Sequence, residues 1–440
     1  MGGGLIQLVA YGSQDIYLSS NPQITFFKSV FKRHTHFSIE SIYQAIDGNT
    51  NFGGSISIVI GRNGDLLGSI YLEVQLPDAN DFKPIGSDYD FYGWIQGIGN
   101  YLVDTATIFI GGQQIDEQFG KWMDIWSQLT LRGSQVDGYG TMVGKDFSAK
   151  PFIPYDVTIS PGNRLYIPLQ FWFCRNPGLA IPIIALQYHE MKINIRFEKY
   201  NKLFVAVKNG NYVNPVINDD DCLPPKITSV KLYSTYYFLD TTERRKFVQN
   251  PHEYLIEQTQ NQKGNVTSIT EENTIRLNFN NPTKELIFIF NKNNSFAPQN
   301  DFSIGTNKIP LGTPKEFSPL YNAKLVINGH DRFTIRHGEY FRLVQPYDHH
   351  TRISSEYIYT YSFSIRPEEH QPSGTCNFTR IDNSLLVFNL RTSDCENCCI
   401  GSRDGNPEED YTTVPSYTIW APCYNILRIM GGMAGLAYNS

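Results

Sequence analysis

The feature that most constrains the fold of this 440-residue chain is an internal repeat. Apolar positions in the first half match positions in the second half at a constant separation of 217 residues, in four stretches that alternate as strands do. The matched sets are Phe37, Ile39 and Glu40 with Tyr254, Ile256 and Glu257; Ile58, Ile60 and Asn63 with Ile275, Leu277 and Asn280; Ile70, Tyr71 and Leu72 with Ile287, Phe288 and Ile289; and Ala106, Ile108, Ile110 and Gly112 with Ala323, Leu325, Ile327 and Gly329. A separation that holds without a gap predicts two copies of one β-domain.

The separation changes only later in the chain. Ile193 and Ile195 match Leu386 and Phe388 at a separation of 193, so the first copy carries 24 additional residues before this point. Each copy has about 200 residues, a size that suits a single β-sandwich or barrel with its own core. This length indicates a domain duplication, because the units of solenoid proteins are far shorter.

Composition excludes several classes of protein. Charged residues make up 18% of the chain and aromatic residues 14%, which is typical of β-rich proteins. The formal net charge of −6 offers no basic stripe for nucleic-acid phosphates, so direct nucleic-acid binding is not expected. The longest apolar run, 179–186, is too short to span a bilayer, and the start of the chain lacks a secretory signal. Seven cysteines without regular spacing indicate folding in a reducing cytoplasm.

Three helices are expected. The first begins at Pro22 after an Asn21 cap and places Ile24, Phe27 and Phe31 on one face. The second covers 120–131, inside the additional length of the first copy, because apolar residues recur there at helical spacing. The third begins at Asp240, which forms a capping box with Glu243, and ends before Pro251. The remaining apolar runs are short strands, which favour paired antiparallel sandwiches of the jelly-roll kind, with other sandwich topologies still open.

Candidate chemical sites are few. Cys395, Cys398 and Cys399 could supply thiolates to zinc with Cys376 or Cys423 as a fourth ligand, but the second pair that structural zinc sites use is missing. We expect free thiols or a disulfide there, and no metal or other cofactor.

Other polar clusters have simpler interpretations. His349 and His350 adjoin Asp348, and His189 adjoins Glu190, but adjacent residues of a strand point to opposite faces and rarely share a site. The segment GTMVGKDF at 140–147 resembles a phosphate-binding loop only superficially, and no residue is predicted to be catalytic. The acidic clusters at 218–221 and 407–410 are interpreted as solvated turns. The tryptophans Trp94, Trp122, Trp126 and Trp172 are interpreted as core or subunit-interface residues.

Three sequons are candidate glycosylation sites: Asn265, Asn293 and Asn377. Asn293 follows a strand-like run and opens a polar stretch, so we expect it to be exposed. Asn377 lies beside Phe378 and Ile381, which we expect to be buried, so a glycan there is disfavoured.

Five segments carry a family resemblance: the N-terminal stretch GGLIQLVAYGSQDIYLSSNPQITFFKSVFKRHTHFSIES, NPGLAIPIIALQYHEMKI at 176–193, PHEYLIEQ at 251–258, QPSGTCNFTRIDNS at 371–384 and YNILRIMGGMAGLAY at 424–438. They closely resemble the major capsid proteins of large icosahedral double-stranded DNA viruses, particularly those of the chlorovirus type. The segments run from end to end of the chain. The loop 391–416 departs from the family pattern.

This resemblance implies an all-β double jelly roll, two eight-stranded antiparallel sandwiches with short helices and long loops. The expected parts are an N-terminal arm (1–24), a first jelly roll (25–240), a linker helix (241–250) and a second jelly roll (251–440). The implied function is a homotrimeric, pseudo-hexagonal capsomer in the virion shell, assembled in the host cytoplasm over an inner membrane. The arm, with Gly2–Ser20 as a flexible tether, would meet minor capsid proteins, and outward loops would bear glycans. A minor capsid paralogue, a jelly-roll carbohydrate-binding protein and a jelly-roll enzyme are the alternatives.

Overall fold

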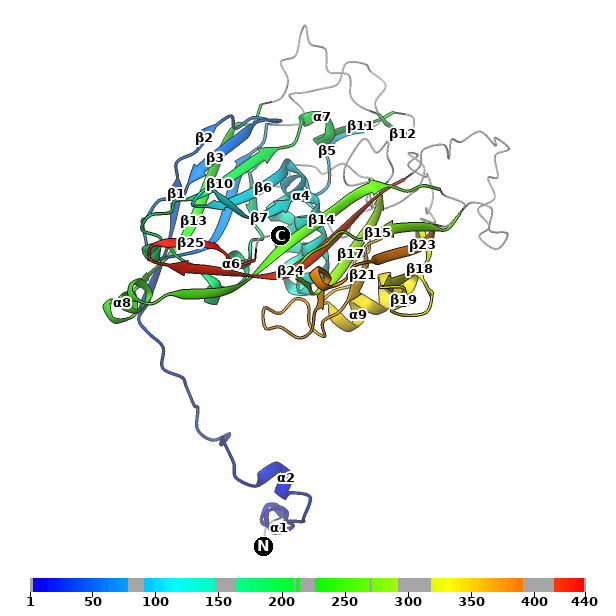
Figure 1. The fold of residues 1–440 in the computed structure, drawn as a ribbon. Coiled ribbons are helices and arrows are strands. Elements are labelled where there is room, and N and C mark those ends of the chain that lie inside the picture. Colours follow the sequence, from blue (N-terminus) through cyan, green and yellow to red (C-terminus); the bar gives the residue numbers. More distant parts are fainter. Residues whose placement is uncertain are drawn as a thin grey trace. The chain divides into compact units, whose positions relative to one another are not determined.

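The computed structural model describes residues 3–77, 91–146, 164–208, 211–213, 226–268, 271–291, 318–390 and 415–438. Contacts divide the chain into two units, Met1–Phe37 and Ser38–Ser440. The larger unit contains two β-sandwiches, each made of two antiparallel sheets (Figure 1).

The first domain is built from sheets A and B. Sheet A has the order β1 (Phe37–Gln44), β13 (Ser229–Leu239), β4 (Leu66–Gln75) and β8 (Arg164–Pro168), with β9 (Ile181–Pro182) also paired to β4. Sheet B has the order β2 (Asp47–Gly48), β3 (Ser55–Val59), β10 (Met191–Phe197), β6 (Val103–Ile110) and β7 (Gln113–Phe119). A small third sheet joins β12 (Asn211–Val213), β11 (Phe204–Lys208) and β5 (Phe91–Trp94).

The second domain repeats this plan in sheets D and E. Sheet D has the order β21 (Tyr359–Ser362), β17 (Glu285–Asn291), β24 (Ser416–Met430), β16 (Pro282–Thr283) and β22 (Cys376–Asn377), and β24 also pairs with β14 (His252–Asn265) and β25 (Met433–Leu436). Sheet E has the order β15 (Asn273–Arg276), β23 (Ser384–Leu390), β18 (Leu320–Ile327) and β19 (His330–Asp331), with β20 (Arg336–His337) beside β18.

The strand order of the two domains is the same, as the repeat predicted. The run β3-β10-β6-β7 of sheet B corresponds to β15-β23-β18-β19 of sheet E, and β1-β13-β4-β8 of sheet A corresponds to β14-β24-β17-β21 of sheet D. Each domain therefore has the eight strands, in two four-stranded sheets, of a jelly roll.

The register of the matched strands also agrees. In sheet B, Ile193 pairs with both Ile58 and Ile108. In sheet E, Leu386 pairs with both Ile275 and Leu325, the residues that the repeat matched to Ile58 and Ile108. The following hairpins agree as well, because Gly111–Gly112 and Asn328–Gly329 both have positive φ at two consecutive positions, as tight two-residue hairpin turns require.

One strand contradicts the constant separation of 217. The match equates Ile70 with Ile287, but Ile70 lies in the first domain's core, whereas Ile287 lies on the outer face of sheet D, toward the first domain. Phe288 lies in the core of the second domain, and its matched residue Tyr71 is on the outer face of sheet A. Successive side chains of a strand point to opposite faces, so β17 is offset by one residue from the match to β4.

Helices fill the connections. They are α3 (Ile98–Leu102), α4 (Gly120–Thr130), α5 (Val136–Val143), α6 (Trp172–Arg175), α7 (Tyr200–Leu203), α8 (Thr241–Gln249) and α9 (Gln345–His349), the last preceded by a π-helical turn at Tyr340–Val344. The expected helix at 120–131 is confirmed as α4, and the four tryptophans assigned to core or interface are buried. The expectation that α4 belongs to the additional length of the first copy is wrong, because the second domain carries Tyr340–His349 in the same place between corresponding strands.

The helix between the domains is α8, as expected, but its cap differs from the prediction. Asp240 occupies the cap position and makes no capping side-chain hydrogen bond. Instead, Asp65 of the first domain accepts a hydrogen bond from the Leu239 backbone N–H at 2.8 Å and pairs with Arg244 at 3.0 Å. The start of α8 is thus held by the carboxylate of Asp65, which directly precedes β4. Because Asp65 is far from α8 in the sequence, no local sequence pattern could predict this contact.

The N-terminal unit has a different secondary structure from the one expected. It contains α1 (Gly3–Val9) and α2 (Ile16–Ser19), and no helix begins at Pro22. Asn21 has a φ of 50°, and Phe27 and Phe31 are 98% and 81% exposed. No described residue of the N-terminal unit buries the proposed apolar face, and most helical stability in proteins comes from such packing. Among the described residues, no helix is long and apolar enough to cross a bilayer.

The one-residue offset can be tested with two substitutions that the sequence match treats as equivalent. Phe288→Ala removes a ring that is 2% exposed and should destabilise the fold by about 3–5 kcal/mol. Tyr71→Ala removes a ring on the outer face of sheet A and should destabilise the fold much less. Thermal unfolding of both variants measures the difference, and equal losses would contradict the opposite orientation of the two side chains.

Candidate functional site

The largest feature outside the two cores is the contact between the domains. One face of α4 carries Trp122, Ile125, Trp126 and Leu129, which pack against Ile287, Ile289, Ile358 and Trp420 of the second domain. All eight side chains are at most 5% exposed. Figure 1 shows α4 behind β14 and beside β17 and β24. A helix of the first domain therefore covers the outer face of sheet D, with apolar burial as the main stabilising term.

The C-terminal hairpin adds a second contact. Leu427, Ile429 and Ala434, from β24 and β25, belong to the apolar core of the first domain. The backbone of Ala434 bonds to the His189 ring at 3.1 Å, and the Tyr188 N–H donates to the Gly432 carbonyl at 3.0 Å. The end of the chain thus fastens the second domain to the loop before β10.

A buried group of charges lies within this contact. Glu257 on β14 is 3.2 Å from Arg175 of the first domain and 3.0 Å from Lys284, and the ring of His370 is 3.6 Å away. Burial favours the neutral acid, but the charges of Arg175 and Lys284 outweigh it and lower the pKa of Glu257 to about 2. Glu257 is therefore ionised, and it joins cations from both domains.

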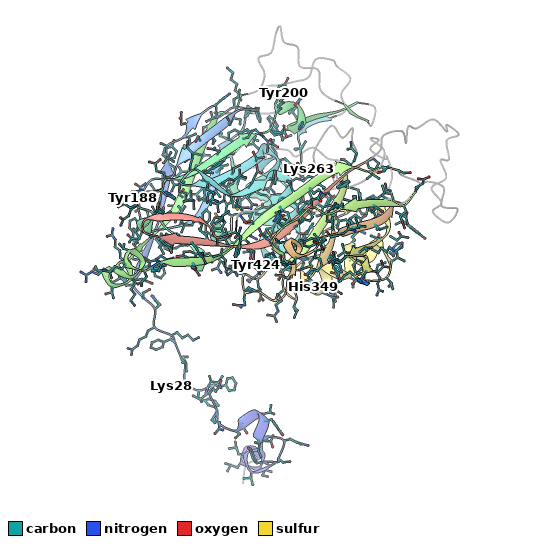
Figure 2. The ribbon with its side chains drawn as sticks, viewed as in Figure 1. Lys28, Tyr188, Tyr200, Lys263, His349 and Tyr424 are labelled. Atoms are coloured by element: carbon teal, nitrogen blue, oxygen red, sulfur yellow. The ribbon has the colours of Figure 1, made fainter. Side chains whose placement is uncertain are left out.

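The two cations are held by further contacts. The Arg175 guanidinium stands over the Trp126 ring at 4.9 Å. Lys284 is fully buried, donates to the Pro367 carbonyl at 2.6 Å and stands 5.3 Å from the ring of Tyr424, labelled in Figure 2. Burial lowers the pKa of Lys284, and the charge of Glu257 opposes that shift. A network of this kind fixes one relative orientation of the groups, since each is costly to leave unpaired.

Another carboxyl group of the domain contact, that of Asp116, has a raised pKa, in contrast to the lowered pKa of Glu257. Asp116 on β7 accepts hydrogen bonds from the Gln118 side chain at 2.7 Å and from the Thr259 backbone at 3.3 Å. Burial raises the pKa of Asp116 to about 7 despite these bonds. No described cation forms an ion pair with Asp116, so burial dominates and the carboxyl group titrates near neutrality.

The inner side of α4 is tied to its own domain by Asp124. This fully buried carboxylate pairs with Lys145 at 2.8 Å and accepts hydrogen bonds from Tyr101 and Gln128. Lys145 belongs to the segment that resembles a phosphate-binding loop. Its role in the structure is to neutralise Asp124 and so position the helix.

A third buried charge group lies within the second domain. His350 is 2.9 Å from Glu285 and 3.0 Å from Glu368, and the side chains of His350 and Glu285 are fully buried. Burial acts to lower the pKa of His350, but the two glutamates outweigh it and raise the pKa to about 9. His350 is therefore a buried imidazolium that links β17 to the segment after β21. The sequence offered no signal for this group, because Glu285 lies 65 positions away.

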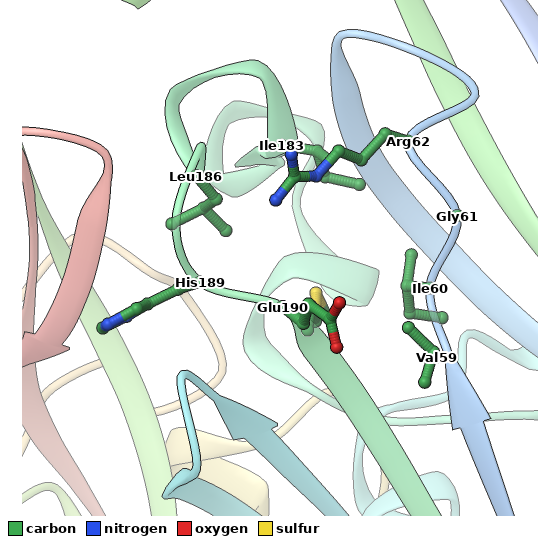
Figure 3. Close-up of a pocket in the computed structure, with 9 residues that line it drawn as sticks. Val59, Ile60, Gly61, Arg62, Ile183, Leu186, His189 and Glu190 are labelled. Carbon is green, nitrogen blue, oxygen red and sulfur yellow. The ribbon is translucent and has the colours of Figure 1, made fainter.

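The hollow drawn in Figure 3 has about 250 Å³ of space and is lined by Val59, Ile60, Gly61, Arg62, Ile183, Leu186, His189, Glu190 and Met191. Its polar groups do not converge. The His189 ring points away from Glu190 toward β25, where it bonds to Ala434 (Figure 3). This confirms that His189 and Glu190 do not form one site.

Comparison with known proteins identifies the family of this chain. The model for the N-terminus of major capsid proteins matches residues 25–240, and the model for the major capsid protein of large eukaryotic DNA viruses matches 243–435. The chain belongs to this family of major capsid proteins. The capsid protein is 41% identical to the major capsid protein of Pyramimonas orientalis virus and 38% identical to that of Paramecium bursaria Chlorella virus 1, in each case over 100% of both chains.

Solved structures agree. A chain in the quasi-atomic structure of the PBCV-1 virus capsid matches with a TM-score of 0.74 and 33% identity, over 94% of this chain and 100% of that one. The Faustovirus major capsid protein has the same fold, with a TM-score of 0.70 at 13% identity. The double jelly roll is thereby confirmed, and the protein is a structural capsid protein of a large double-stranded DNA virus.

Three of the five segments that carry the family resemblance meet at the domain contact. Glu257 and Gln258 lie in 251–258, Tyr188 and His189 lie in 176–193, and the C-terminal hairpin lies in 424–438. The Gln258 side chain donates to the Ile115 carbonyl of the first domain. Three of the segments that carry the family resemblance therefore supply residues to the contact between the domains.

The remaining sequence-based candidates are scattered. Asn265, at the end of β14, is exposed, and Asn377 is also exposed, although Phe378 beside it is buried. Asn293, the cysteines at 395, 398 and 399 and both acidic clusters lie outside the described residues. Cys376 and Cys423 are free thiols, and the described part of the chain contains no group of metal-binding side chains.

The charge group at the domain contact gives a matched test. Glu257→Gln removes the only carboxylate bonded to Arg175 and Lys284 among the described contacts and should cost about 3–5 kcal/mol, because the buried Lys284 and the half-buried Arg175 lose their counter-charge. Glu253→Gln, on the same strand, breaks an exposed pair with Arg428 and should change stability by less than about 1 kcal/mol. Thermal unfolding compares the two, and similar losses would show that the buried cluster does not hold the domains.

The His350 group predicts a pH dependence. The folded chain keeps the proton up to about pH 9, whereas an unfolded histidine releases it near 6.5. The stabilisation is therefore complete below pH 6.5 and disappears as pH rises to 9, a change on the order of 3 kcal/mol. His350→Gln should remove this part of the pH dependence of the unfolding midpoint. A variant whose midpoint falls as steeply as that of the wild type over this range would contradict the assignment.

Proposed function

We propose that this capsid protein assembles into homotrimeric capsomers that tile the outer icosahedral shell of the virion. The observation that carries the proposal is the equivalence of the two domains in strand order and register. Three chains related by a threefold axis would place six similar sandwiches in a ring, a nearly hexagonal block that can meet six neighbours. The self-association of the family's members in capsids supports this role.

Further parts of the proposal concern partners and location. The parts of the chain would be an arm (1–24), two jelly rolls (25–240 and 251–440) and the linker between them. The arm would contact minor capsid proteins beneath the shell, over an inner membrane, and assembly would take place in the host cytoplasm. The exposed apolar residues of the arm, among them Leu8, Tyr17 and Leu18, support a partner-binding role. No catalytic or cofactor-dependent activity is part of this proposal.

Covalent glycans are also proposed, with Asn265 as the first candidate because its side chain is exposed at the end of a strand. Asn377 is a weaker candidate, since its side-chain oxygen already accepts a hydrogen bond from the Thr379 backbone at 3.1 Å. Asn293 stays a candidate on its sequon alone. Glycans on outward surfaces would suit a shell component.

The native mass of the purified chain tests the proposed assembly. Light scattering over a range of concentrations should give about three times the chain mass of 50.2 kDa, with no dissociation on dilution. A folded chain that stays at the monomer mass at every concentration would contradict the trimeric capsomer.

A further inference from the structure

The second domain contains a segment that corresponds to α4, but its outer side covers no described sheet of the same chain. The segment Tyr340–His349 occupies the position of α4 between corresponding strands, and a separation of 218 aligns the two. Met123, on the inner side of α4, is in the core of the first domain, and its counterpart Phe341 is in the core of the second. The inner sides of the two segments therefore serve the same purpose.

The outer sides of the two segments differ in what covers them. Ile125, Trp126 and Leu129 of α4 are buried against sheet D. At the same separation of 218 stand Leu343, Val344 and Tyr347, which are 40%, 44% and 77% exposed. The second domain thus presents an apolar row with the spacing of the α4 row, and no described residue of the same chain buries it.

A matching surface lies on the outer face of sheet A, which corresponds to the face of sheet D that α4 covers. Four tyrosines form a continuous row there, one from each strand. Ring centroids are 6.1 Å apart for Tyr43 and Tyr233, 5.3 Å for Tyr233 and Tyr71, and 6.4 Å for Tyr71 and Tyr166. Tyr43 is 50% exposed and Tyr166 is 36% exposed. We call these four residues the tyrosine row.

A single chain cannot bring these two surfaces together. Figure 1 shows α9 and β1 at opposite sides of the double domain. Large apolar and aromatic side chains that gather on one surface and remain uncovered mark interaction sites. No described residue of the double domain covers either surface, and the internal repeat points to the occupant, since the chain already contains this helix-on-sheet contact once.

We infer that the tyrosine row is the docking site for residues 340–349 of a second copy of this chain, in the geometry by which α4 docks on sheet D. This inference rests on the proposed capsomer and names its interface. Charges agree with it, because exposed Asp348 follows the apolar row, and Lys231 and Arg164 flank the tyrosine row beside Glu73. Each copy offers one surface of each kind, so the contact is head to tail and closes into a ring.

Substitutions on each side test the contact separately. Leu343→Asp combined with Val344→Asp, and Tyr166→Asp alone, should each convert the trimer to monomer at concentrations where the wild type stays trimeric. Matched controls are Val59→Asp and Val248→Asp, which place the same charge at side chains that are 49% and 44% exposed, on β3 and α8. Near-ultraviolet circular dichroism of each variant verifies the fold. Trimers that persist in both folded variants would overturn the inference.

A photocrosslink keeps the test independent of stability. With p-benzoylphenylalanine in place of Tyr347, irradiation of the full-length trimer should give a product of twice the chain mass, and mass spectrometry should map the link to β1, β13, β4 or β8. A link from Tyr347 to any other surface, in a chain that is trimeric, would overturn this interface and leave the proposed capsomer intact. A wild-type chain that is monomeric throughout would overturn both.

Discussion

The structure depends on the burial of one face of α4 against sheet D. Four apolar side chains of a first-domain helix replace solvent over the outer face of a second-domain sheet, and that face carries Ile287, Ile289 and Trp420 as a consequence. A jelly-roll sheet normally has one apolar and one polar face. Here β17 is apolar on both faces, which is why every residue from Glu285 to Asn291 is buried. The two sandwiches thus become one body instead of two domains on a linker.

Charged groups give this apolar contact its orientation. Apolar surfaces can slide over one another at little cost, whereas Glu257 must meet Arg175 and Lys284 at about 3 Å. Asp116 adds a group that titrates near neutral pH between the domains. A capsomer assembled from rigid double domains needs this fixed orientation, since a small rotation between the sandwiches would prevent a ring from closing.

The sequence predicted the repeated strands better than the groups that join them. Ile58, Ile108 and Ile193 were matched to the correct partners because alternation along a strand is a local signal. The match failed by one residue at Ile70 and Ile287, since both sit in apolar runs and only the covering helix decides which face is outward. Arg175, Glu257 and Lys284 escaped detection as a group because no spacing connects residues so far apart in the chain. The helix expected at Pro22 failed because periodicity does not show whether an apolar face finds a partner.

The central claim is that one helix-on-sheet contact is used twice, once within the chain and once between copies. A cryo-electron microscopy reconstruction of the assembled capsomer tests it most directly. The account predicts that residues 340–349 of each chain lie across Tyr71 and Tyr233 of the next, in the position that α4 takes over Ile287 and Trp420. A capsomer in which solvent, or a different segment, covers these tyrosines would contradict it.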